Sequence, residues 1–332
     1  MISEIKDAIF QSKNILLTLH HSPDDDSYGS NLALYSYLRS IKKKVTLIKG
    51  DSTAKKHFSV YPNYEKITKK DISQIDLEKF DLFIVLDCAD KSMISKRIDV
   101  DIPRTLKTIV IDHHISNDSY GDINLIDPNA AATCQILYDI FVALKTKITP
   151  DIAICLYLGI AGDTGYFRNS NTTARIFEIV SILTKIYPNF YKKTFELENS
   201  NSVSYIKLMA LMLNNIDLRL NGKVAIASAT YKEVTDNNIN FEDLGYLDIA
   251  NTLKSVTGWE VGISMIEDQI GSTKIGLRTR DSEKYNLGLI GLSTGFGGGH
   301  RAAAGLRLPY DISKSKEIVL AAIKNYLKKH GR

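Results

Sequence analysis

The sequence predicts an α/β protein, with an open, mainly parallel sheet that has helices on both faces and a smaller α/β domain after it. In the first part of the chain, short apolar runs alternate with longer segments of helical periodicity. This alternation is typical of parallel strands joined by crossover helices. The chain has 332 residues, which favours two domains over one.

The elements of the first part follow from their apolar patterns. Residues 14–19 (NILLTL) form a continuous apolar run, which predicts a buried strand, and the apolar spacing of residues 28–41 predicts a helix after it. Further strand-length runs stand at 45–48, 82–86 and 108–111. Helical patterns follow at 133–144, 150–161 and 173–186.

The pattern breaks down at 187–204, a polar segment that carries Pro188 and shows no clear period. A helix is expected at 205–215, strands at 223–230, 261–267 and 274–280, and a last helix near 313–329. We therefore expect a first domain at 1–186, a linker and connecting helix at 187–215, and a second domain at 216–332.

Composition narrows the class of protein. Hydrophobic residues make up 44% and charged residues 24%, which excludes disordered and fibrous classes. Three cysteines are too few and too scattered for a disulfide framework. The polar N-terminus and the short apolar runs predict no signal peptide and no membrane span, so we expect a cytoplasmic protein. The net charge of +4 lies entirely in the part after residue 186.

Acidic and histidine side chains follow three of the predicted strands. His20 follows the first strand and leads into three successive carboxylates, Asp87 follows the strand at 82–86, and Asp112, His113 and His114 follow the strand at 108–111. Ligands bind at the carboxyl ends of strands in open α/β sheets. An acidic turn capping a helix is the simpler reading of any one of these, but three at the same edge favour a site for divalent cations.

These residues resemble the motifs of the DHH phosphoesterases. The resemblance covers nearly the whole chain, with the motifs in the family's order. The matching segments are His20-x-x-Pro23-Asp24-x-Asp26-x-x-Gly29-Ser30, Asp87, Asp112-His113-His114, Asp163-Thr164-Gly165, and Phe296-Gly297-Gly298-Gly299-His300 with Ala303-Ala304-Gly305.

The resemblance implies a site for two divalent metal ions, usually manganese, in the first domain. His20 and Asp24 would hold one ion, and Asp26, His113 and Asp163 the other. Asp87 would bridge the two ions, His114 would contact the scissile phosphate, and Asp112 would orient the neighbouring histidines. Two such ions clamp a phosphoryl group and activate water at neutral pH.

The second domain would hold the substrate. The resemblance places Arg278 and a glycine loop, Gly297, Gly298 and Gly299 with His300, on the nucleotide. Successive glycine N–H groups can cradle a phosphate, although a glycine run by itself is more often a flexible loop. Arg168, after Asp163, is a further candidate for the substrate, with a local structural role equally open.

The chain departs from the family's pattern after the third motif. Many members have two serines and a glutamate where this chain has Ala131, Ala132 and Gln135, with Thr133 kept. Any contact that those hydroxyls make elsewhere is therefore in question. None of the expected metal ligands is changed.

The leading reading is a manganese-dependent phosphodiesterase that hydrolyses short oligoribonucleotides to nucleoside 5′-monophosphates. The same chemistry fits two alternatives, a 3′-phosphoadenosine 5′-phosphate phosphatase and a phosphodiesterase for cyclic dinucleotides or their linear products. A third reading, a nucleotide-binding regulator without turnover, ranks lower because every expected ligand is present. The expected partner is a short oligonucleotide or nucleotide, with no membrane, and a homodimer is left open.

Overall fold

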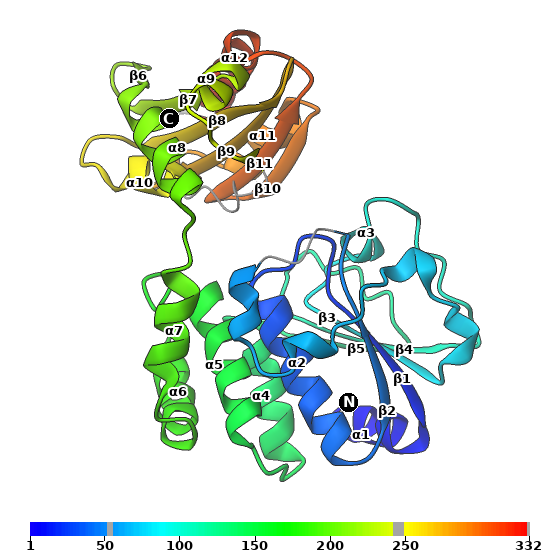
Figure 1. The fold of residues 1–332 in the computed structure, drawn as a ribbon. Helices are drawn as coiled ribbons and strands as arrows, with labels where there is room; N and C mark the ends of the chain where they lie inside the picture. Colours follow the sequence, from blue (N-terminus) through cyan, green and yellow to red (C-terminus); the bar gives the residue numbers. More distant parts are fainter. Residues whose placement is uncertain (52–55, 242–248, 331–332) are drawn as a thin grey trace. The chain divides into compact units, whose positions relative to one another are not determined.

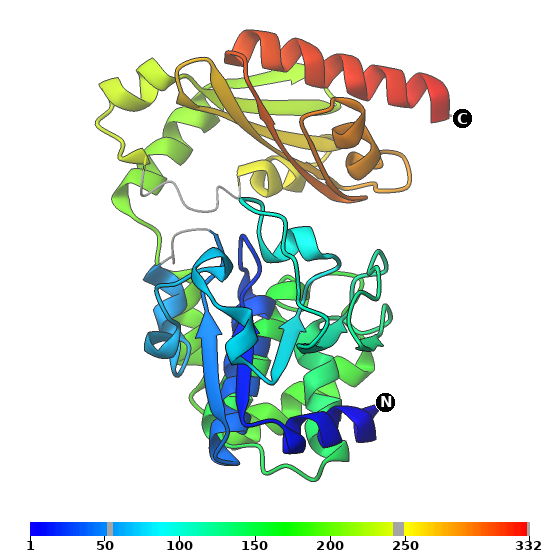
Figure 2. The same ribbon diagram turned by 90° about the vertical axis from the view of Figure 1, so that its right-hand side faces the viewer.

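The computed structural model describes residues 1–51, 56–241 and 249–330. The chain forms two compact units, Met1–Ser200 and Asn201–Arg332 (Figures 1 and 2). Each unit has its own sheet and its own hydrophobic clusters, and each is described by itself.

The first unit is built on a five-stranded parallel sheet in the order β2-β1-β3-β4-β5. Its elements are α1 (Ile2–Gln11), β1 (Asn14–Thr18), α2 (Asp25–Ser40), β2 (Lys44–Ile48), η1 (Lys56–Val60), η2 (Tyr64–Lys66), η3 (Ile72–Gln74), η4 (Leu77–Lys79), β3 (Leu82–Leu86), α3 (Lys91–Ile94), β4 (Lys107–Asp112), β5 (Ile123–Ile126), α4 (Thr133–Ala143), α5 (Pro150–Asp163), α6 (Ala174–Ile186) and α7 (Phe190–Glu198). The predicted open parallel sheet is thereby confirmed.

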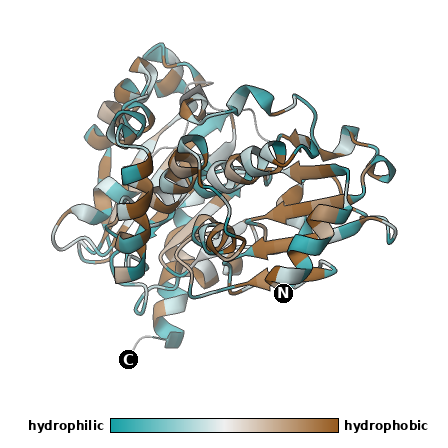
Figure 3. Cartoon of the chain, turned by 90° about the horizontal axis from the view of Figure 1, so that it is seen from below, coloured by the Kyte–Doolittle hydropathy of each residue, from teal (hydrophilic) through white to brown (hydrophobic). Residues whose placement is uncertain are grey.

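Both faces of this sheet are buried because successive side chains of a strand point to opposite sides. In β3, Leu82, Ile84 and Leu86 join the cluster formed with α1, α2, α4 and α5. Phe83 and Val85 join the opposite cluster, which is closed by the short helices α3, η3 and η4. Figure 3 shows the resulting strands as nearly continuous hydrophobic segments. The carboxyl ends of all five strands therefore meet at one edge.

The second unit has a six-stranded mixed sheet in the order β10-β11-β9-β8-β7-β6. Its elements are α8 (Val203–Asn214), β6 (Ile216–Arg219), β7 (Val224–Ala229), α9 (Tyr231–Asp236), α10 (Ile249–Ser255), β8 (Val261–Gln269), β9 (Ser272–Thr279), α11 (Leu287–Ser293), β10 (Gly297–His300), β11 (Ala303–Leu308) and α12 (Ile312–His330). One face carries a cluster closed by α11 and α12, and the other carries a cluster closed by α8 and α10.

Two expectations need correction. The segment expected to be an irregular linker contains helix α7, whose Leu197 is buried in the core of the first unit. The glycine run Gly297–His300 is an edge strand paired with β11, and not a loop. A Cβ at Gly297 would lie 2.2 Å from the carbonyl oxygen of Gly305, so the two strands approach too closely for a side chain. At Gly299 the same holds, and its φ of +152° also favours glycine.

Candidate metal centre

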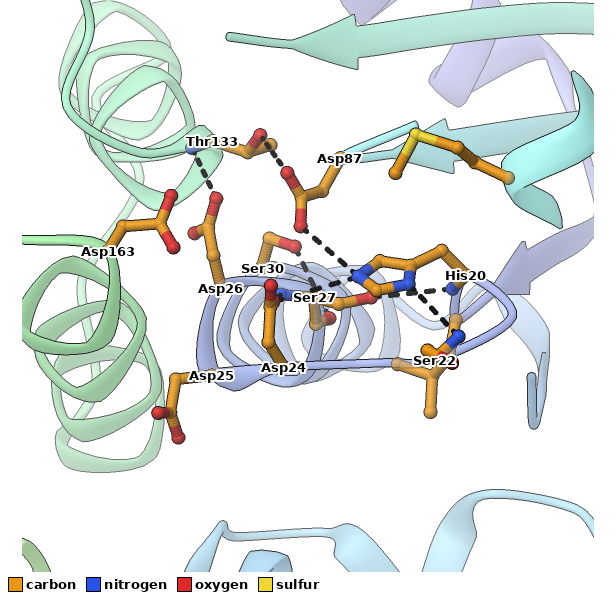
Figure 4. A network of polar contacts seen from close by, with 12 residues as sticks. His20, Ser22, Asp24, Asp25, Asp26, Ser27, Ser30, Asp87, Thr133 and Asp163 are labelled. Carbon is orange, nitrogen blue, oxygen red and sulfur yellow. Dashed lines mark hydrogen bonds and ion pairs between the residues drawn. The ribbon is translucent and has the colours of Figure 1, made fainter. Parts of the chain in front are cut away.

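Three strand ends and two helix ends of the first unit bring acidic and histidine side chains to one place at the carboxyl edge of the sheet. His20 follows β1, Asp87 follows β3, and Asp112 ends β4 just before His113 and His114. The start of α2 and the end of α5 supply the remaining carboxylates, Asp24, Asp26 and Asp163. Figure 4 shows His20, Asp24, Asp26, Asp87 and Asp163 turned toward a common space.

The donor atoms form three overlapping groups within which all atoms lie no more than 4.8 Å apart. These groups are His20, Asp24 and Asp87; Asp26, His113 and Asp163; and Asp87, His113 and His114. Asp87 belongs to two of them. Its Oδ2 lies 3.7 Å from Nε2 of His20, and its Oδ1 lies 3.6 Å from Nε2 of His113. Asp87 therefore stands between the two outer groups.

The carboxylates repel one another strongly in this arrangement. Burial, together with the charges of Asp26 and Asp24, raises the pKa of Asp87 well above its usual range. Burial and the charge of Asp26 raise the pKa of Asp163 to about 7, although a hydrogen bond with His113 acts in the opposite direction. Cations placed among these oxygens would remove the repulsion.

The donor set fits divalent metal ions. Carboxylate oxygens suit hard cations such as magnesium and manganese, and imidazole nitrogens extend the choice toward transition metals. His20 and Asp87 are almost fully buried, whereas the side chain of Asp24 is about half exposed, at 49%. The cluster therefore combines buried ligands with an open side through which a substrate could enter.

Asp87 has a strained backbone. Its φ is +60°, a left-handed conformation that is uncommon for residues other than glycine, with aspartate and asparagine the least unfavourable of the rest. Its N–H donates to the carbonyl of Ile111 at 3.0 Å, and its Oδ1 accepts a hydrogen bond from Oγ1 of Thr133 at 3.3 Å. Backbone strain of this kind persists where the surroundings fix the conformation.

Asp26 caps a helix that lies more than one hundred residues further along the chain. Its Oδ2 accepts from the N–H of Thr133 at 2.6 Å, and its Oδ1 from the N–H of Cys134 at 2.9 Å. These N–H groups begin α4, whose N-cap residue Ala132 provides no side-chain cap. A carboxylate at a helix N-terminus is stabilised by the N–H groups and the helix dipole.

This arrangement accounts for the departures after the third motif. With Asp26 accepting the first N–H groups of α4, a hydroxyl at position 132 is not needed as the cap. Gln135 reaches back to the preceding turn, where its Oε1 accepts from the N–H of Ala131 at 2.8 Å. The local structure is thus complete with alanine at 131 and 132.

Close packing of α2 against α5 brings Asp26 and Asp163 together. Gly29 of α2 lies against α5, since a Cβ there would stand 2.6 Å from the carbonyl oxygen of Cys155. Gly159 of α5 lies against Cys134 and Asp26, and Gly162 lies against the side chain of Asp25. Larger residues at these positions would push the two helices, and their carboxylates, apart.

Asp112 holds the two histidines that follow it. Its carboxylate is fully buried, and its Oδ1 accepts from the backbone N–H of His113 at 2.8 Å and contacts Nδ1 of His114 at 2.7 Å. Burial acts to raise the pKa of Asp112, but the hydrogen bonds from His114 and Asn117 outweigh it and lower that pKa. An ionised Asp112 requires that Nδ1 of His114 carry a proton, and Nε2 is the ring nitrogen that does not face Asp112.

Asn117 is a residue of this site that the sequence patterns do not reveal. Its Nδ2 donates to Oδ2 of Asp112 at 2.7 Å and to the carbonyl of Cys88 at 3.0 Å. The second partner is a backbone atom of another strand end, so no spacing of residue types could have indicated it.

The turn after Asp163 is unusual, and it contains Arg168. Gly165, Tyr166 and Phe167 all have positive φ, at 58°, 56° and 65°. Arg168 is exposed, and its Nε donates to the carbonyl of Gly165 at 2.8 Å, which braces this turn. The structure thus gives Arg168 a local role, and its contact with a substrate remains a proposal.

The remaining predicted residues lie in the second unit. Arg278 in β9 is half-buried, and its Nη1 donates to the carbonyl of Leu277 at 2.9 Å. In the sheet register, Ala303 of β11 pairs with Arg278 on one side and with His300 on the other. The side chain of His300 lies outside what the structure describes.

Comparison with known proteins supports the resemblance. Residues 14–160 match the model of the DHH family, N-terminal domain. The protein "Bifunctional oligoribonuclease and PAP phosphatase NrnA" of Thermus thermophilus is 27% identical over 96% of this chain and 91% of that protein. The protein of the same name from Bacillus subtilis is 26% identical over 99% of this chain and 100% of that protein.

Solved structures share the fold. An exopolyphosphatase-related protein from Bacteroides fragilis superposes with a TM-score of 0.89, at 21% identity, over 100% of this chain and 97% of that chain. RecJ from Thermus thermophilus, in complex with Mn2+, superposes with a TM-score of 0.54, at 12% identity, over 99% of this chain and 54% of that chain. Within the described part of this chain, none of the helices is long and apolar enough to span a membrane.

Proposed function

We propose that this chain belongs to the DHH family and is a two-metal phosphodiesterase that hydrolyses short oligoribonucleotides to nucleoside 5′-monophosphates. The observation that carries the proposal is the cluster of three histidines and four carboxylates at the carboxyl edge of the parallel sheet. The names of the Thermus and Bacillus relatives support the choice of substrate, because both include oligoribonuclease.

The proposed roles follow the three groups of donor atoms. His20 and Asp24 would hold one ion, Asp26, His113 and Asp163 the other, and Asp87 would bridge them. We propose manganese because the set mixes imidazole with carboxylate ligands, whereas magnesium and calcium sites are built almost wholly from oxygen. When bound, the two ions would neutralise the phosphate and lower the pKa of an attacking water from 15.7 toward about 7.

The residues of the chain would position the substrate and supply a proton donor. His114, held through Nδ1 by the ionised Asp112, would direct Nε2 at a phosphate oxygen. To donate a hydrogen bond to that oxygen, the ring would have to carry protons on both nitrogens, and this imidazolium would stabilise the negative charge that builds up during attack at phosphorus. Asp112 would hold the ring in place through Nδ1–H and would not itself touch the substrate.

The second unit would bind the nucleotide. Arg278, the glycine strand Gly297–Gly299 and His300 are the proposed contacts, and Arg168 of the first unit is a further one. The region 269–310 supports this role by its charge, since it holds six Lys or Arg residues against two Asp or Glu residues. Basic groups and close glycine backbone favour binding of an anionic phosphate.

A second activity on 3′-phosphoadenosine 5′-phosphate has a specific observation in its favour. Both relatives carry PAP phosphatase beside oligoribonuclease in their names. The same metal centre would cleave either a diester or a terminal monoester, because the reaction at phosphorus needs the same charge neutralisation. Cyclic dinucleotides and their linear products remain a further substrate class to be tested.

Three properties of the protein in the cell belong to the same proposal. The three cysteines are all free and buried, which supports the cytoplasm as the location. A homodimer is a hypothesis that light scattering of the purified protein would decide. A short nucleic acid or nucleotide is the proposed partner, whether the protein is a monomer or a homodimer.

The activity is tested with purified protein, Mn²⁺ and labelled di- to pentaribonucleotides, with 3′-phosphoadenosine 5′-phosphate and a cyclic dinucleotide in parallel. We expect release of nucleoside 5′-monophosphates, and a loss of roughly 10³-fold or more in Asp87→Ala, since the proposed bridging ligand is removed. The matched control is Asp81→Ala, at the opposite end of β3, where the carboxylate only accepts the N–H groups of Lys13 and Asn14. This control should keep turnover within about threefold of wild type.

Two results would contradict the proposal. If wild-type protein with Mn²⁺ leaves all three substrates intact, the enzymatic reading is wrong. If it binds nucleotide tightly but turns over no faster than Asp87→Ala, the protein is a nucleotide-binding regulator.

A further inference from the structure

The segment that follows β4 is fastened to the strand end that carries Asp87. Nδ2 of Asn117 donates to the carbonyl of Cys88 at 3.0 Å, and the hydroxyl of Tyr120 donates to the same carbonyl at 3.3 Å. The N–H of Asp118 donates to the carbonyl of Ala89 at 3.0 Å. Three hydrogen bonds thus hold the two residues directly after Asp87.

Asn117 differs from Tyr120 and Asp118 because it also reaches the other ligand-bearing strand. The same Nδ2 donates to Oδ2 of Asp112 at 2.7 Å, while Oδ1 accepts from the N–H of Ser119 at 2.7 Å. Both hydrogens of one amide group are therefore used, one on each strand end. A carboxylate or an aliphatic side chain of the same size has no such pair of donors.

The end of β3 is strained, and the end of β4 orients two of the candidate ligands. The left-handed backbone of Asp87 is unfavourable, and fixing the carbonyl of Cys88 restricts its return to an extended conformation. The carboxylate of Asp112 holds His113 through its N–H and His114 through Nδ1. The separations of 3.6 Å and 3.7 Å between Asp87 and these histidines depend on both.

We propose that Asn117 is a positioning residue that couples the end of β3 to the end of β4, so that Asp87, His113 and His114 are already arranged to receive metal ions. This inference rests on the proposed function, since it takes the cluster to be a metal centre. Asn117 acts through Asp112 and the backbone of Cys88, and it need not touch an ion or the substrate itself.

A residue that merely braces the loop is available for comparison. Asn124 lies in β5, directly after the same connection, is also half-buried, and also uses its amide on the backbone. Its Oδ1 accepts from the N–H of Gly121 at 2.9 Å, and its Nδ2 donates to the carbonyl of Gly121 at 2.7 Å. None of its described hydrogen bonds reaches a strand end that carries a candidate ligand. Asn124→Ala is therefore the matched control for Asn117→Ala.

The experiment measures Mn²⁺ binding to the full-length metal-free protein by titration calorimetry, beside thermal unfolding without metal. We expect Asn117→Ala to weaken Mn²⁺ binding by about 10–100-fold, the range found when groups that orient metal ligands are removed. Asn124→Ala should lower the unfolding temperature to a similar extent, but leave the Kd for Mn²⁺ within about twofold of wild type. The electron paramagnetic resonance spectrum of bound Mn²⁺ should change in the Asn117 variant only.

A milder variant keeps the test decisive if Asn117→Ala does not fold. Asn117→Ser retains one short donor and should weaken Mn²⁺ binding by an intermediate amount. A Kd within twofold of wild type in the folded Asn117 variant would overturn the inference and leave the proposed function in place. If the wild-type protein itself binds no Mn²⁺, the metal centre is wrong and the inference falls with it.

Discussion

At the residue scale, His113 and Asp163 share one environment in which protons and metal ions compete. Nε2 of His113 lies 3.1 Å from Oδ2 of Asp163. Burial acts to lower the pKa of His113, but the hydrogen bond with Asp163 and the charge of Asp26 raise it to about 9. The pKa of Asp163 is about 7, so at neutral pH the metal-free site holds protons that a cation must displace.

Mn²⁺ binding should therefore strengthen as the pH rises. Both pKa values lie above the usual ones, so His113 is protonated and Asp163 partly protonated at pH 7, and both lose protons as the pH approaches 9. Between pH 6 and 8 the Kd should fall by about tenfold per pH unit for each proton displaced. Calorimetry in two buffers of different ionisation enthalpy should show net proton release. A Kd that is constant over this range would contradict the prediction.

His20, Asp87 and His113 could be found from the sequence because they closely follow apolar strands, whereas Asp163, which ends helix α5, was assigned only through the family resemblance. The structure brings His20, Asp87 and His113 together as expected, while their binding of metal stays a prediction. Asn117 could not be found in this way, because one of its two partners is the backbone carbonyl of Cys88 on another strand. Similarly, the capping of α4 by Asp26 depends on how the chain returns after more than one hundred residues.

At the element scale, the contact between α2 and α5 sets the distance between two sources of carboxylates. Gly159 stands at this contact. A Cβ there would lie 2.3 Å from Sγ of Cys134, 3.2 Å from Oδ1 of Asp26 and 3.3 Å from the carbonyl oxygen of Asp25. One of the atoms at this contact is Oδ1 of Asp26, a proposed metal ligand. A change in the packing of the two helices would therefore also move this ligand.

Gly159→Ala should destabilise the protein, although Gly→Ala within a helix is usually favourable. The usual gain of about 0.5–1 kcal/mol is outweighed by overpacking, which costs about 1–3 kcal/mol. Denaturant unfolding should show a net loss of about 1–2 kcal/mol, and Mn²⁺ binding should weaken because Asp26 is displaced. The double variant Gly159→Ala/Cys134→Ala removes the closest contact, so it should recover part of the stability. If the loss of unfolding free energy in the double variant equals the sum of the losses in the two single variants, this mechanism is wrong.

The elements themselves were predictable where apolar residues recur at a regular spacing. The predicted helix at 150–161 and strand at 82–86 correspond to α5 and β3. Helix α7 was missed because only Leu197 of its residues is buried, which leaves almost no periodic signal. Strand β10 was missed because a glycine run has no side chains to form a pattern, and its pairing with β11 is decided by close backbone approach.

At the scale of the whole molecule, the two units have separate cores, and the proposed metal ligands all lie in the first one. A ligand that binds one folded unit stabilises that unit, and the other only as far as the two are coupled. The division at Ser200 therefore has a thermodynamic consequence.

Calorimetric unfolding of the full chain should show two transitions, of which Mn²⁺ raises only one. At a free Mn²⁺ concentration of 100 times the Kd, the first unit should gain about 2.7 kcal/mol, or about 5–10 °C for about 200 residues. A chelator should reverse this shift and leave the second transition in place. If both transitions move together, the two units unfold as one.

The backbone of Asp87 has a consequence for how this chain can evolve. The residue adds left-handed strain to a buried carboxylate that stands among other carboxylates, and a glycine at this position would relieve both costs. A chain without that carboxylate would be the more robust molecule in the absence of metal. Selection for thermal robustness alone would therefore erode the centre, so a trade-off between durability and the proposed metal binding is concentrated at one position.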